Sequence, residues 1–281
     1  MEPIFEIKQL NKIYKDFWGR SKKQAVTNLT LDLQKGEVLG LIGPNGAGKT
    51  TTIKVLLGLL KPSSGSVRVF GQHPSSLKVK ARLGFLPEES YLYKFLTPYE
   101  TLLFFGRLFS FSKKELDERI HHLLKLVGLS HVANTPVKEF SKGMTRRLGL
   151  AQSMINDPEL LLLDEPTSGL DPLGTKEVKN LILDQKKQGK SVLVCSHLLA
   201  DMESVCDRIA MLIEGKRVLF DSVESLLKVQ SEITLRFKET EKIKGVDWKE
   251  ILSQTGVEKV EVNHPHKSLE QLFLETIAKE N

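Results

Sequence analysis

Residues 43–50 read Gly43-Pro44-Asn45-Gly46-Ala47-Gly48-Lys49-Thr50, which matches the pattern G-x-x-x-x-G-K-[ST] in full. The motif follows the apolar run 38–42 and precedes a helical pattern over 50–60, which is the strand–loop–helix context of a phosphate-binding loop. Glycines let backbone N–H groups approach phosphate oxygens, and the start of a helix favours anions. A chance match is on the order of one per cent in a chain of this length. The sequence therefore predicts a nucleotide phosphate site here.

Two side chains of this loop have expected roles. Lys49 can reach the β- and γ-phosphates, and the Thr50 hydroxyl can ligate Mg²⁺. A nucleoside triphosphate and Mg²⁺ are therefore the predicted ligands of the loop, and the family resemblance described below implies that the nucleotide is ATP. The predicted nucleotide-binding residues of the loop are Gly43, Pro44, Asn45, Gly46, Ala47, Gly48, Lys49, Thr50 and Thr51.

A second apolar run, 160–163, ends in Asp164 and Glu165. A carboxylate at the end of such a strand can lie beside a phosphate loop and hold Mg²⁺, which is the role predicted for Asp164. Glu165 is then placed to polarise an attacking water. Alone, the pattern also fits a strand that ends in a solvated acidic turn. The upstream phosphate loop favours the functional interpretation.

His197 follows the apolar run 191–195, which places it at the same carboxyl edge of a parallel sheet. There it can form a hydrogen bond with a γ-phosphate. A lone histidine at a strand end is usually structural, so only this context favours a functional role. The predicted catalytic residues are Glu165, His197 and Lys49.

The order of apolar patterns indicates an α/β fold with a mostly parallel sheet and a helical insertion. Strands are predicted over 4–7, 29–33, 38–42, 67–70, 160–163 and 191–195, and helices over 50–60, 99–109, 113–127, 145–156, 176–188 and 221–228, with 84–86 closing the first section. The pattern changes near residue 228. Short strands at 232–237 and 257–262 and a last helix at 269–278 predict a small α+β extension over 229–281, which would pack on the main domain or on a second subunit.

Composition is typical of a folded chain, with 40% apolar and 27% charged residues among 281. The formal charge of +6 is best explained by a slightly basic solvated surface, with nucleic acid or an anionic membrane as the alternative partners. No apolar run approaches the roughly 18–20 residues that cross a bilayer, and the start lacks the pattern of a signal peptide. The sequence therefore predicts a cytoplasmic protein.

Phe140-Ser141-Lys142-Gly143-Met144, about twenty residues before Asp164, resembles the ABC signature usually written LSGGQ. Together with the motifs above it makes residues 4–225 similar to the ABC ATPase superfamily. The resemblance implies a RecA-like P-loop core over 1–228, with an antiparallel β subdomain and a helical subdomain at about 88–150. It also implies a head-to-tail homodimer or heterodimer, in which Ser141, Lys142, Gly143 and Met144 contact ATP held by the other subunit. Taken alone, Ser141 fits an ordinary helix N-cap.

Three further motifs enter through the same resemblance. Glu88 occupies the place of the usual Q-loop glutamine and is a predicted metal ligand, with Glu89 as the neighbouring alternative. Tyr14 resembles the aromatic residue that stacks on adenine, although Phe17, Trp18 or simple local packing are alternatives. Ser168-Gly169-Leu170-Asp171 resembles the D-loop, and Ser196-His197 the H-loop.

The chain looks most like the ATPases of ABC-2-type exporters for drugs, sodium or polysaccharides. This resemblance implies an ATP-hydrolysing subunit that powers export through a separate membrane permease, bound peripherally at the cytoplasmic face. The helical subdomain would transmit motion to the permease, with Leu102, Phe104, Phe105 and Phe109 divided between core and partner. Soluble ABC ATPases that act on ribosomes or nucleic acid are the alternative, although no nucleic acid is expected. A non-catalytic subunit is less favoured, because the catalytic side chains are all present.

Overall fold

The computed structural model describes residues 2–15, 21–228, 234–237, 260–263 and 275. The chain divides into two units, Met1–Val223 and Glu224–Asn281. The sequence places the corresponding boundary after residue 228. Phe17 and Trp18, the proposed alternatives to Tyr14, lie outside the described residues.

A six-stranded sheet forms the centre of the first unit. Its strand order is β5 (Leu83–Leu86), β6 (Leu160–Asp164), β7 (Ser191–Ser196), β3 (Val38–Ile42), β8 (Arg208–Ile213) and β9 (Lys216–Ser222). All neighbours pair in parallel except β8 and β9. Every residue of β3, β6 and β7 is buried, which explains why these strands read as continuous apolar runs. Their carboxyl ends meet at one edge of the sheet, where ligands of open α/β sheets bind.

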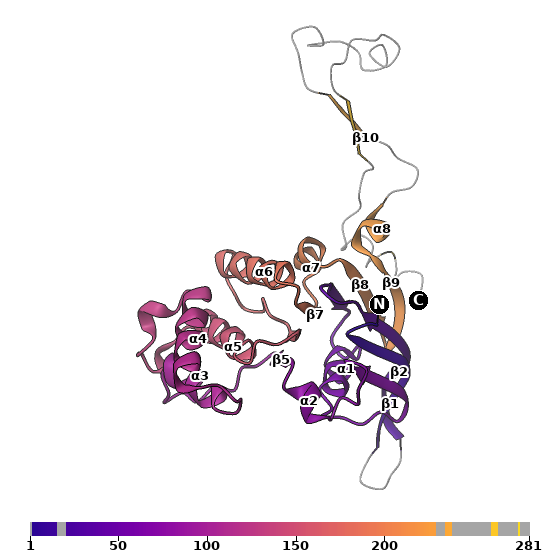
Figure 1. Ribbon diagram of the computed structural model, residues 1–281. Helices are drawn as coiled ribbons and strands as arrows, with labels where there is room; N and C mark the ends of the chain where they lie inside the picture. The colour runs from indigo at the N-terminus through magenta and orange to yellow at the C-terminus, as the bar shows by residue number, and fades with distance from the viewer. Residues whose placement is uncertain (1, 16–20, 229–233, 238–259, 264–274, 276–281) are drawn as a thin grey trace. The chain divides into compact units, whose positions relative to one another are not determined.

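A second, antiparallel sheet has the order β2 (Ser21–Leu33), β1 (Phe5–Lys15) and β4 (Ser64–Val69). The helix α1 (Lys49–Leu56) contacts both sheets, whereas α6 (Pro172–Lys187) and α7 (Leu199–Val205) contact the other face of the central sheet (Figure 1). Both β1 and β2 are longer than the segments 4–7 and 29–33. Their register shifts between Ile7 and Leu10 and again near Lys12, and such bulges break the two-residue alternation that reveals a strand in a sequence.

The helical insertion contains α3 (Pro98–Gly106), α4 (Lys113–Leu126) and α5 (Lys142–Ser153), which gather to one side of the sheets (Figure 1). Capping boxes begin α3 at Thr97 and α4 at Ser112, and Ser141 caps α5. Helix α5 therefore begins three residues before the predicted position, and the signature forms its first turn. The insertion also contains the 3₁₀ turns η1 (Ser130–Val132) and η2 (Val137–Glu139), whereas the short helix α2 (Leu77–Lys80) lies beside α1 (Figure 1).

The α/β fold, the mostly parallel sheet, the antiparallel subdomain and the helical insertion are thus confirmed. The predicted helix 221–228 is wrong at its start, because β9 continues to Ser222 and α8 spans only Val223–Leu227. The helix α7 and the strands β8 and β9 were not predicted from the sequence. In the second unit, β10 (Thr234–Phe237) pairs antiparallel with β11 (Val260–Asn263), and the predicted helix 269–278 falls outside the described residues apart from Glu275. No helix in the described part of the chain has the length and apolarity to cross a membrane.

Candidate active site

The phosphate loop leaves β3 and enters α1 at the carboxyl edge of the central sheet. Gly48 has a φ of 104°, and a Cβ there would lie 2.6 Å from the Ala25 carbonyl oxygen. At Gly43 a Cβ would lie 2.2 Å from the Leu212 carbonyl oxygen, so both positions require glycine. The backbone N–H groups of Gly48, Lys49 and Thr50 have no acceptor among the residues that the structure describes. The loop therefore presents free donors at a helix start, as an anion site needs.

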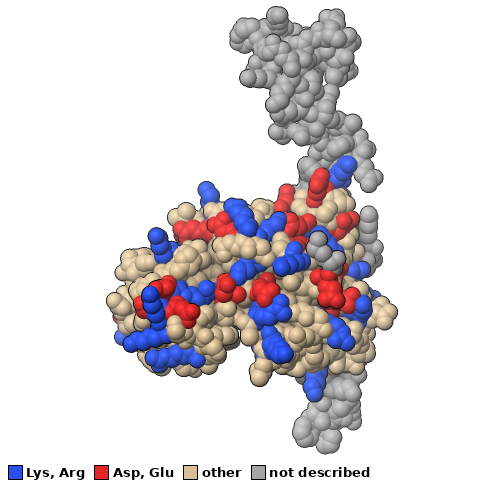
Figure 2. All heavy atoms as spheres, in the orientation of Figure 1, with Lys and Arg blue, Asp and Glu red and all other residues tan. Residues whose placement is uncertain are grey.

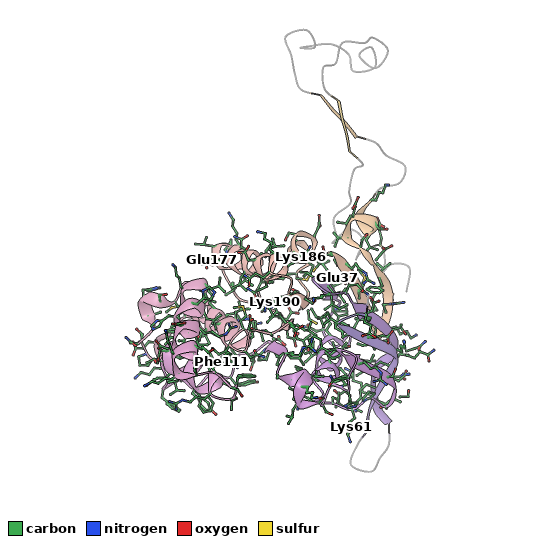
Figure 3. All side chains as sticks on the ribbon, viewed as in Figure 1. Glu37, Lys61, Phe111, Glu177, Lys186 and Lys190 are labelled. Carbon is green, nitrogen blue, oxygen red and sulfur yellow. The ribbon has the colours of Figure 1, made fainter. Side chains whose placement is uncertain are left out.

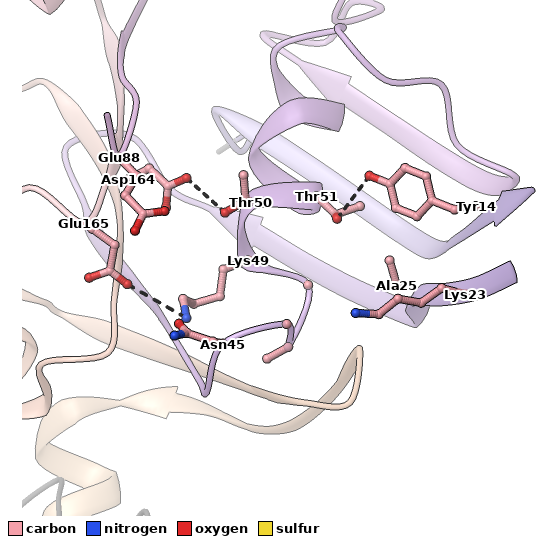
Figure 4. Close-up of a pocket in the computed structure, with 13 residues that line it drawn as sticks. Tyr14, Lys23, Ala25, Asn45, Lys49, Thr50, Thr51, Glu88, Asp164 and Glu165 are labelled. Carbon is pink, nitrogen blue, oxygen red and sulfur yellow. Dashed lines mark hydrogen bonds and ion pairs between the residues drawn. The ribbon is translucent and has the colours of Figure 1, made fainter. Parts of the chain in front are cut away.

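Lys49 places a buried ammonium group at the centre of this loop. Its Nζ donates to the carbonyl oxygens of Gly43 at 2.6 Å and Pro44 at 3.3 Å. It also lies 3.9 Å from Oε1 of Glu165 (Figure 4). A buried cation is costly without such partners, so the loop carbonyls and the Glu165 carboxylate hold the ammonium group where it faces a bound anion.

Thr50 and Asp164 form the oxygen pair of the candidate metal site. The Thr50 hydroxyl donates to Oδ2 of Asp164 at 3.1 Å (Figure 4). Burial raises the pKa of Asp164, and the nearby carboxylates of Glu165 and Glu88 raise it further, against the lowering effects of Thr50 and Lys49. Hydroxyl and carboxylate oxygens are the donors that Mg²⁺ prefers, together with substrate phosphates. The residues at this edge therefore fit Mg²⁺.

Glu165 follows Asp164 in a backbone conformation that is rare for a residue with a side chain. Its φ is 50°, and its N–H donates to the Cys195 carbonyl at 2.8 Å. Its carboxylate is buried, and Oε2 contacts Nδ1 of His197 at 2.9 Å and Oγ of Ser196 at 3.3 Å. The left-handed conformation costs about 1–2 kcal/mol, so these contacts hold the side chain at the edge against strain.

His197 is therefore placed beside a carboxylate, which the sequence did not predict. Parallel pairing of β6 with β7 sets Asp164 opposite Cys195, so the residues that follow each strand become neighbours. The side chain of His197 is 52% exposed, which leaves part of the ring open to a ligand.

Tyr14 lies at the far end of the same pocket. Its hydroxyl is 3.4 Å from Oγ1 of Thr51, and its ring is partly exposed. Lys23 is paired with Tyr14 across the β1–β2 ladder, and its Nζ would lie 3.6 Å from a Cβ built at Gly46. No sequence motif marks Lys23 as a site residue. The antiparallel register is the signal that identifies it, and that register is hidden by the bulges.

These segments together enclose one pocket of about 370 Å³. It is lined by Tyr14, Lys23, Ala25, Asn45, Gly46, Ala47, Gly48, Lys49, Thr50, Thr51, Glu88, Asp164 and Glu165 (Figure 4). The predicted residues Gly43 and Pro44 do not line it, but they accept the hydrogen bonds of Lys49.

The signature lies outside this pocket. Oγ of Ser141 accepts the N–H of Met144 at 3.2 Å, so Ser141 is the N-cap of α5. The four residues Ser141, Lys142, Gly143 and Met144 line a separate hollow with the D-loop residues Gly169, Leu170 and Asp171. Within one chain the signature and the phosphate loop therefore line different hollows.

The phosphate loop, the two acids and the helical insertion define a P-loop nucleotide-binding protein. The chain belongs to the ABC transporter family, whose model matches residues 26–168. The resemblance to ABC ATPases is thereby confirmed.

Several curated relatives share most of this chain. It is 44% identical to an uncharacterized ABC transporter ATP-binding protein of Synechocystis, over 80% of this chain and 64% of that protein. It is 38% identical to the lantibiotic transport ATP-binding protein SrtF of Streptococcus pyogenes, over 79% of this chain and 94% of that protein. It is 36% identical to the bacitracin transport ATP-binding protein BcrA of Bacillus licheniformis, over 88% of this chain and 78% of that protein. The match with the Synechocystis protein spans less than two thirds of that relative's length.

Solved structures show the same fold. An ATP-binding subunit of an ABC transporter superposes with a TM-score of 0.75 at 25% identity, over 98% of this chain and 99% of that one. An ATP-binding cassette bound to ADP and Pi, in a dimeric post-hydrolysis state, superposes with a TM-score of 0.71 at 26% identity, over 78% and 98%.

Proposed function

We propose that the chain binds ATP with Mg²⁺ in the pocket of Figure 4 and hydrolyses it, as the ATP-binding subunit of a transporter that exports its cargo through a separate membrane permease. The observation that carries the proposal is the convergence of two strand ends on one helix start. Asp164 contacts Thr50, and Glu165 lies beside Lys49. This pairing brings a metal ligand and a base to the loop that holds phosphates.

The hydrolytic roles follow from these positions. Mg²⁺, held by Thr50, Asp164 and Glu88, would neutralise charge on the phosphates. Glu165 orients a water for in-line attack on the γ-phosphorus and accepts a hydrogen bond from it. Lys49 and the free N–H groups of the loop stabilise the charge that develops on the γ-phosphate oxygens. His197 holds the Glu165 carboxylate and can donate to the same phosphate.

A second subunit would complete each site. The signature residues Ser141–Met144 occupy a helix start that is not part of the phosphate-loop pocket of their own chain, so another chain would bring such a start to the bound nucleotide. We assign residues 1–228 to the nucleotide-binding domain and the extension 229–281 to packing or dimerisation. Relatives that are transport ATP-binding proteins and the dimeric cassette support this assembly.

Exposed aromatic side chains mark the proposed contact with the permease. Tyr91, Phe95 and Leu108 are more than 70% exposed. The Tyr93 ring contacts the Phe95 ring in a tilted geometry and the Phe104 ring edge to face, with ring centroids 5.7 and 5.6 Å apart. An exposed aromatic cluster of this kind is typical of a partner-binding surface. Leu102, by contrast, is fully buried, so the helical subdomain divides its apolar residues between core and surface. A permease contact would place the chain at the cytoplasmic face of the membrane.

The face drawn in Figure 2 carries charged side chains of both signs, which does not favour nucleic acid as a partner on this face. On the face drawn in Figure 2, Lys and Arg side chains alternate with Asp and Glu side chains, and both signs occur over the helical insertion and the core. A protein that tracks a phosphate backbone concentrates basic residues on one face or groove.

Replacement of Glu165 by Gln tests the catalytic assignment. The variant should bind ATP with Mg²⁺ as the wild type does, because the amide keeps the shape of the side chain, and its turnover should fall by about 10²–10⁴-fold. Phosphate release and equilibrium binding of a fluorescent ATP analogue measure the two properties. Glu118→Gln, on the exposed side of α4, is the matched control. Normal hydrolysis by Glu165→Gln would contradict the proposal.

The permease contact has its own test. Phe95→Asp should reduce co-purification of the tagged chain with the permease from detergent-solubilised membranes, while ATP binding is retained. Leu77→Asp, at an exposed leucine of α2 outside the helical subdomain, controls for lost apolar surface. Equal recovery of the permease with Phe95→Asp would remove the cluster from the interface.

A further inference from the structure

A buried arginine lies behind the catalytic acids. Arg146, in the second turn of α5, is 5% exposed. Its Nε donates to the carbonyl oxygen of Pro166 at 3.2 Å, its Nη1 to those of Pro87 and Glu88, and its Nη2 to those of Asp164 and Glu165. A guanidinium group has five N–H donors, one on Nε and two on each Nη. Each donor position is therefore matched by one main-chain carbonyl.

The acceptors make this arrangement unusual for a buried cation. All five are neutral main-chain carbonyls, and no ion pair joins Arg146 to a carboxylate within the described part of the chain. Burial lowers the pKa of Arg146 to about 10, while the charges of Asp164, Glu165 and Glu88 oppose that shift. The group stays protonated at neutral pH. Burying a charged group costs free energy unless hydrogen bonds compensate it, so the five-carbonyl geometry around Arg146 calls for a functional explanation.

The five carbonyls belong to two segments that contribute residues to the nucleotide pocket. Pro87 and Glu88 follow β5, whereas Asp164 ends β6 and Glu165 and Pro166 follow it. Helix α5, which carries Arg146, begins with the signature. One turn beyond Arg146, a Cβ at Gly149 would lie 2.6 Å from Oγ of Ser90, so α5 also packs closely against the segment after Glu88. Helix α5 is thus joined to these segments at two successive turns, at Arg146 by hydrogen bonds and at Gly149 by close packing.

We propose that Arg146 is a positioning residue that fixes the backbone of Glu165 and Glu88 to the signature helix. It thereby holds the carboxylates of Glu165 and Glu88 in the positions that hydrolysis requires. Arg146 does not itself line the pocket and acts through the pocket residues whose carbonyls it binds. It holds the carbonyl of Glu165, whose φ of 50° is strained, and keeps the carboxylate from relaxing away from Lys49. This inference rests on the proposed hydrolysis of ATP. If Ser141–Met144 shift on contact with another subunit's nucleotide, the Arg146 side chain would transmit that displacement to Glu165 and Glu88.

Arg146→Lys and Arg146→Met, each in the full 281-residue chain, test the proposal. Lysine keeps the charge but has three donors on one nitrogen and cannot serve two separate segments. We expect kcat to fall by about 100-fold, as for a misplaced catalytic group, while KM and the Kd for ATP with Mg²⁺ change by less than about threefold. ATP-dependent dimerisation in a Glu165→Gln background should persist. The thermal shift on adding ATP reports whether each variant is folded.

Arg119 provides the matched control. It donates to the carbonyls of Met154 and Ile155 at the end of α5, and its guanidinium lies 5.9 Å from the ring of Phe111, labelled in the helical subdomain in Figure 3. Arg119→Lys also removes a guanidinium that binds carbonyls of this region, but away from the pocket. It should lower the Tm without a selective loss of kcat.

The outcomes separate the two claims. If the wild-type chain neither binds nor hydrolyses ATP, the proposed function fails. If the wild type hydrolyses ATP and folded Arg146→Lys keeps its kcat, the positioning role alone is overturned. The same conclusion follows if Arg119→Lys loses kcat to the same extent, or if Arg146→Lys loses ATP affinity in step with turnover, because both results indicate a general structural effect.

Discussion

Nδ1 of His197 lies 2.9 Å from Oε2 of Glu165, although 32 positions separate the two residues in the chain. The two residues follow two neighbouring parallel strands. The Glu165 carboxylate also contacts Ser196 and Lys49, and it is the group placed to orient water. At the carboxyl edge of the central sheet, His197 can therefore form hydrogen bonds with two groups, the Glu165 carboxylate and a bound phosphate. Its substitution should expose how strongly hydrolysis depends on a fixed Glu165.

His197→Ala should lower kcat by about 10²-fold, because Glu165 loses a partner and a phosphate loses a donor. The Kd for ATP should change by less than about threefold, since the loop supplies most of the phosphate contacts. Steady-state phosphate release and nucleotide titration give both values. His73→Ala is the control, because His73 contacts Ser75 away from the pocket. Unchanged turnover in His197→Ala would remove the histidine from the mechanism.

Asp164→Asn should stabilise the chain in the absence of nucleotide. Burial and two nearby carboxylates raise the pKa of Asp164 above its ordinary 3.8, so the folded chain binds the proton more tightly than the unfolded chain does. The ionised form therefore costs stability; this cost is absent below pH 3.8, grows as the pH rises through the raised pKa, and is complete above it. At neutral pH the variant should unfold at a higher Tm than the wild type.

Thermal unfolding of both chains between pH 4 and 8, without nucleotide, measures this difference. The gap in Tm should narrow as the pH falls. Mg²⁺-dependent hydrolysis should be lost in the same variant, because the amide lacks the charge that holds the cation. A lower Tm for Asp164→Asn at neutral pH would show that the electrostatic account of this site is wrong.

Lys23→Met should weaken ATP binding by roughly threefold at low salt, because an exposed ion pair contributes at most about 1 kcal/mol. The effect should shrink as ionic strength rises, since salt screens an exposed charge. Calorimetric titration with ATP at two salt concentrations tests both statements. Lys78→Met, on the exposed surface of α2, controls for the change in net charge. A salt-independent loss of affinity would instead indicate damage to β2.

Glu88→Gln should raise the Mg²⁺ concentration for half-maximal ATPase activity by roughly threefold to tenfold, because ligand charge sets the affinity for a hard cation. Glu89→Gln is the control, since the Glu89 carboxylate accepts a hydrogen bond from Tyr91 and does not line the pocket. A shift in Glu89→Gln with none in Glu88→Gln would transfer the metal role to Glu89.

Local patterns predicted much of the fold. The phosphate loop and the buried strands β3, β6 and β7 are short, continuous signals that tertiary context cannot easily override. Residues 216–222 were harder to predict, because four positions of β9 are only partly buried, the other three are exposed, and the segment lacks a clear period. The strands β1 and β2 were underestimated because bulges interrupt their alternation.

The sequence by itself determined which chemical groups the pocket contains. A glycine-rich loop before a helix, and acids after an apolar strand, are local motifs whose chemistry can be predicted from a few consecutive residues. Only the tertiary structure decided how these groups meet. Strand order brings β6 and β7 beside β3, so that Glu165 joins both Lys49 and His197, and the packing of α5 buries Arg146 against carbonyls from two distant segments. Main-chain carbonyls occur at every residue, so no sequence pattern can mark the ones that an arginine will bind.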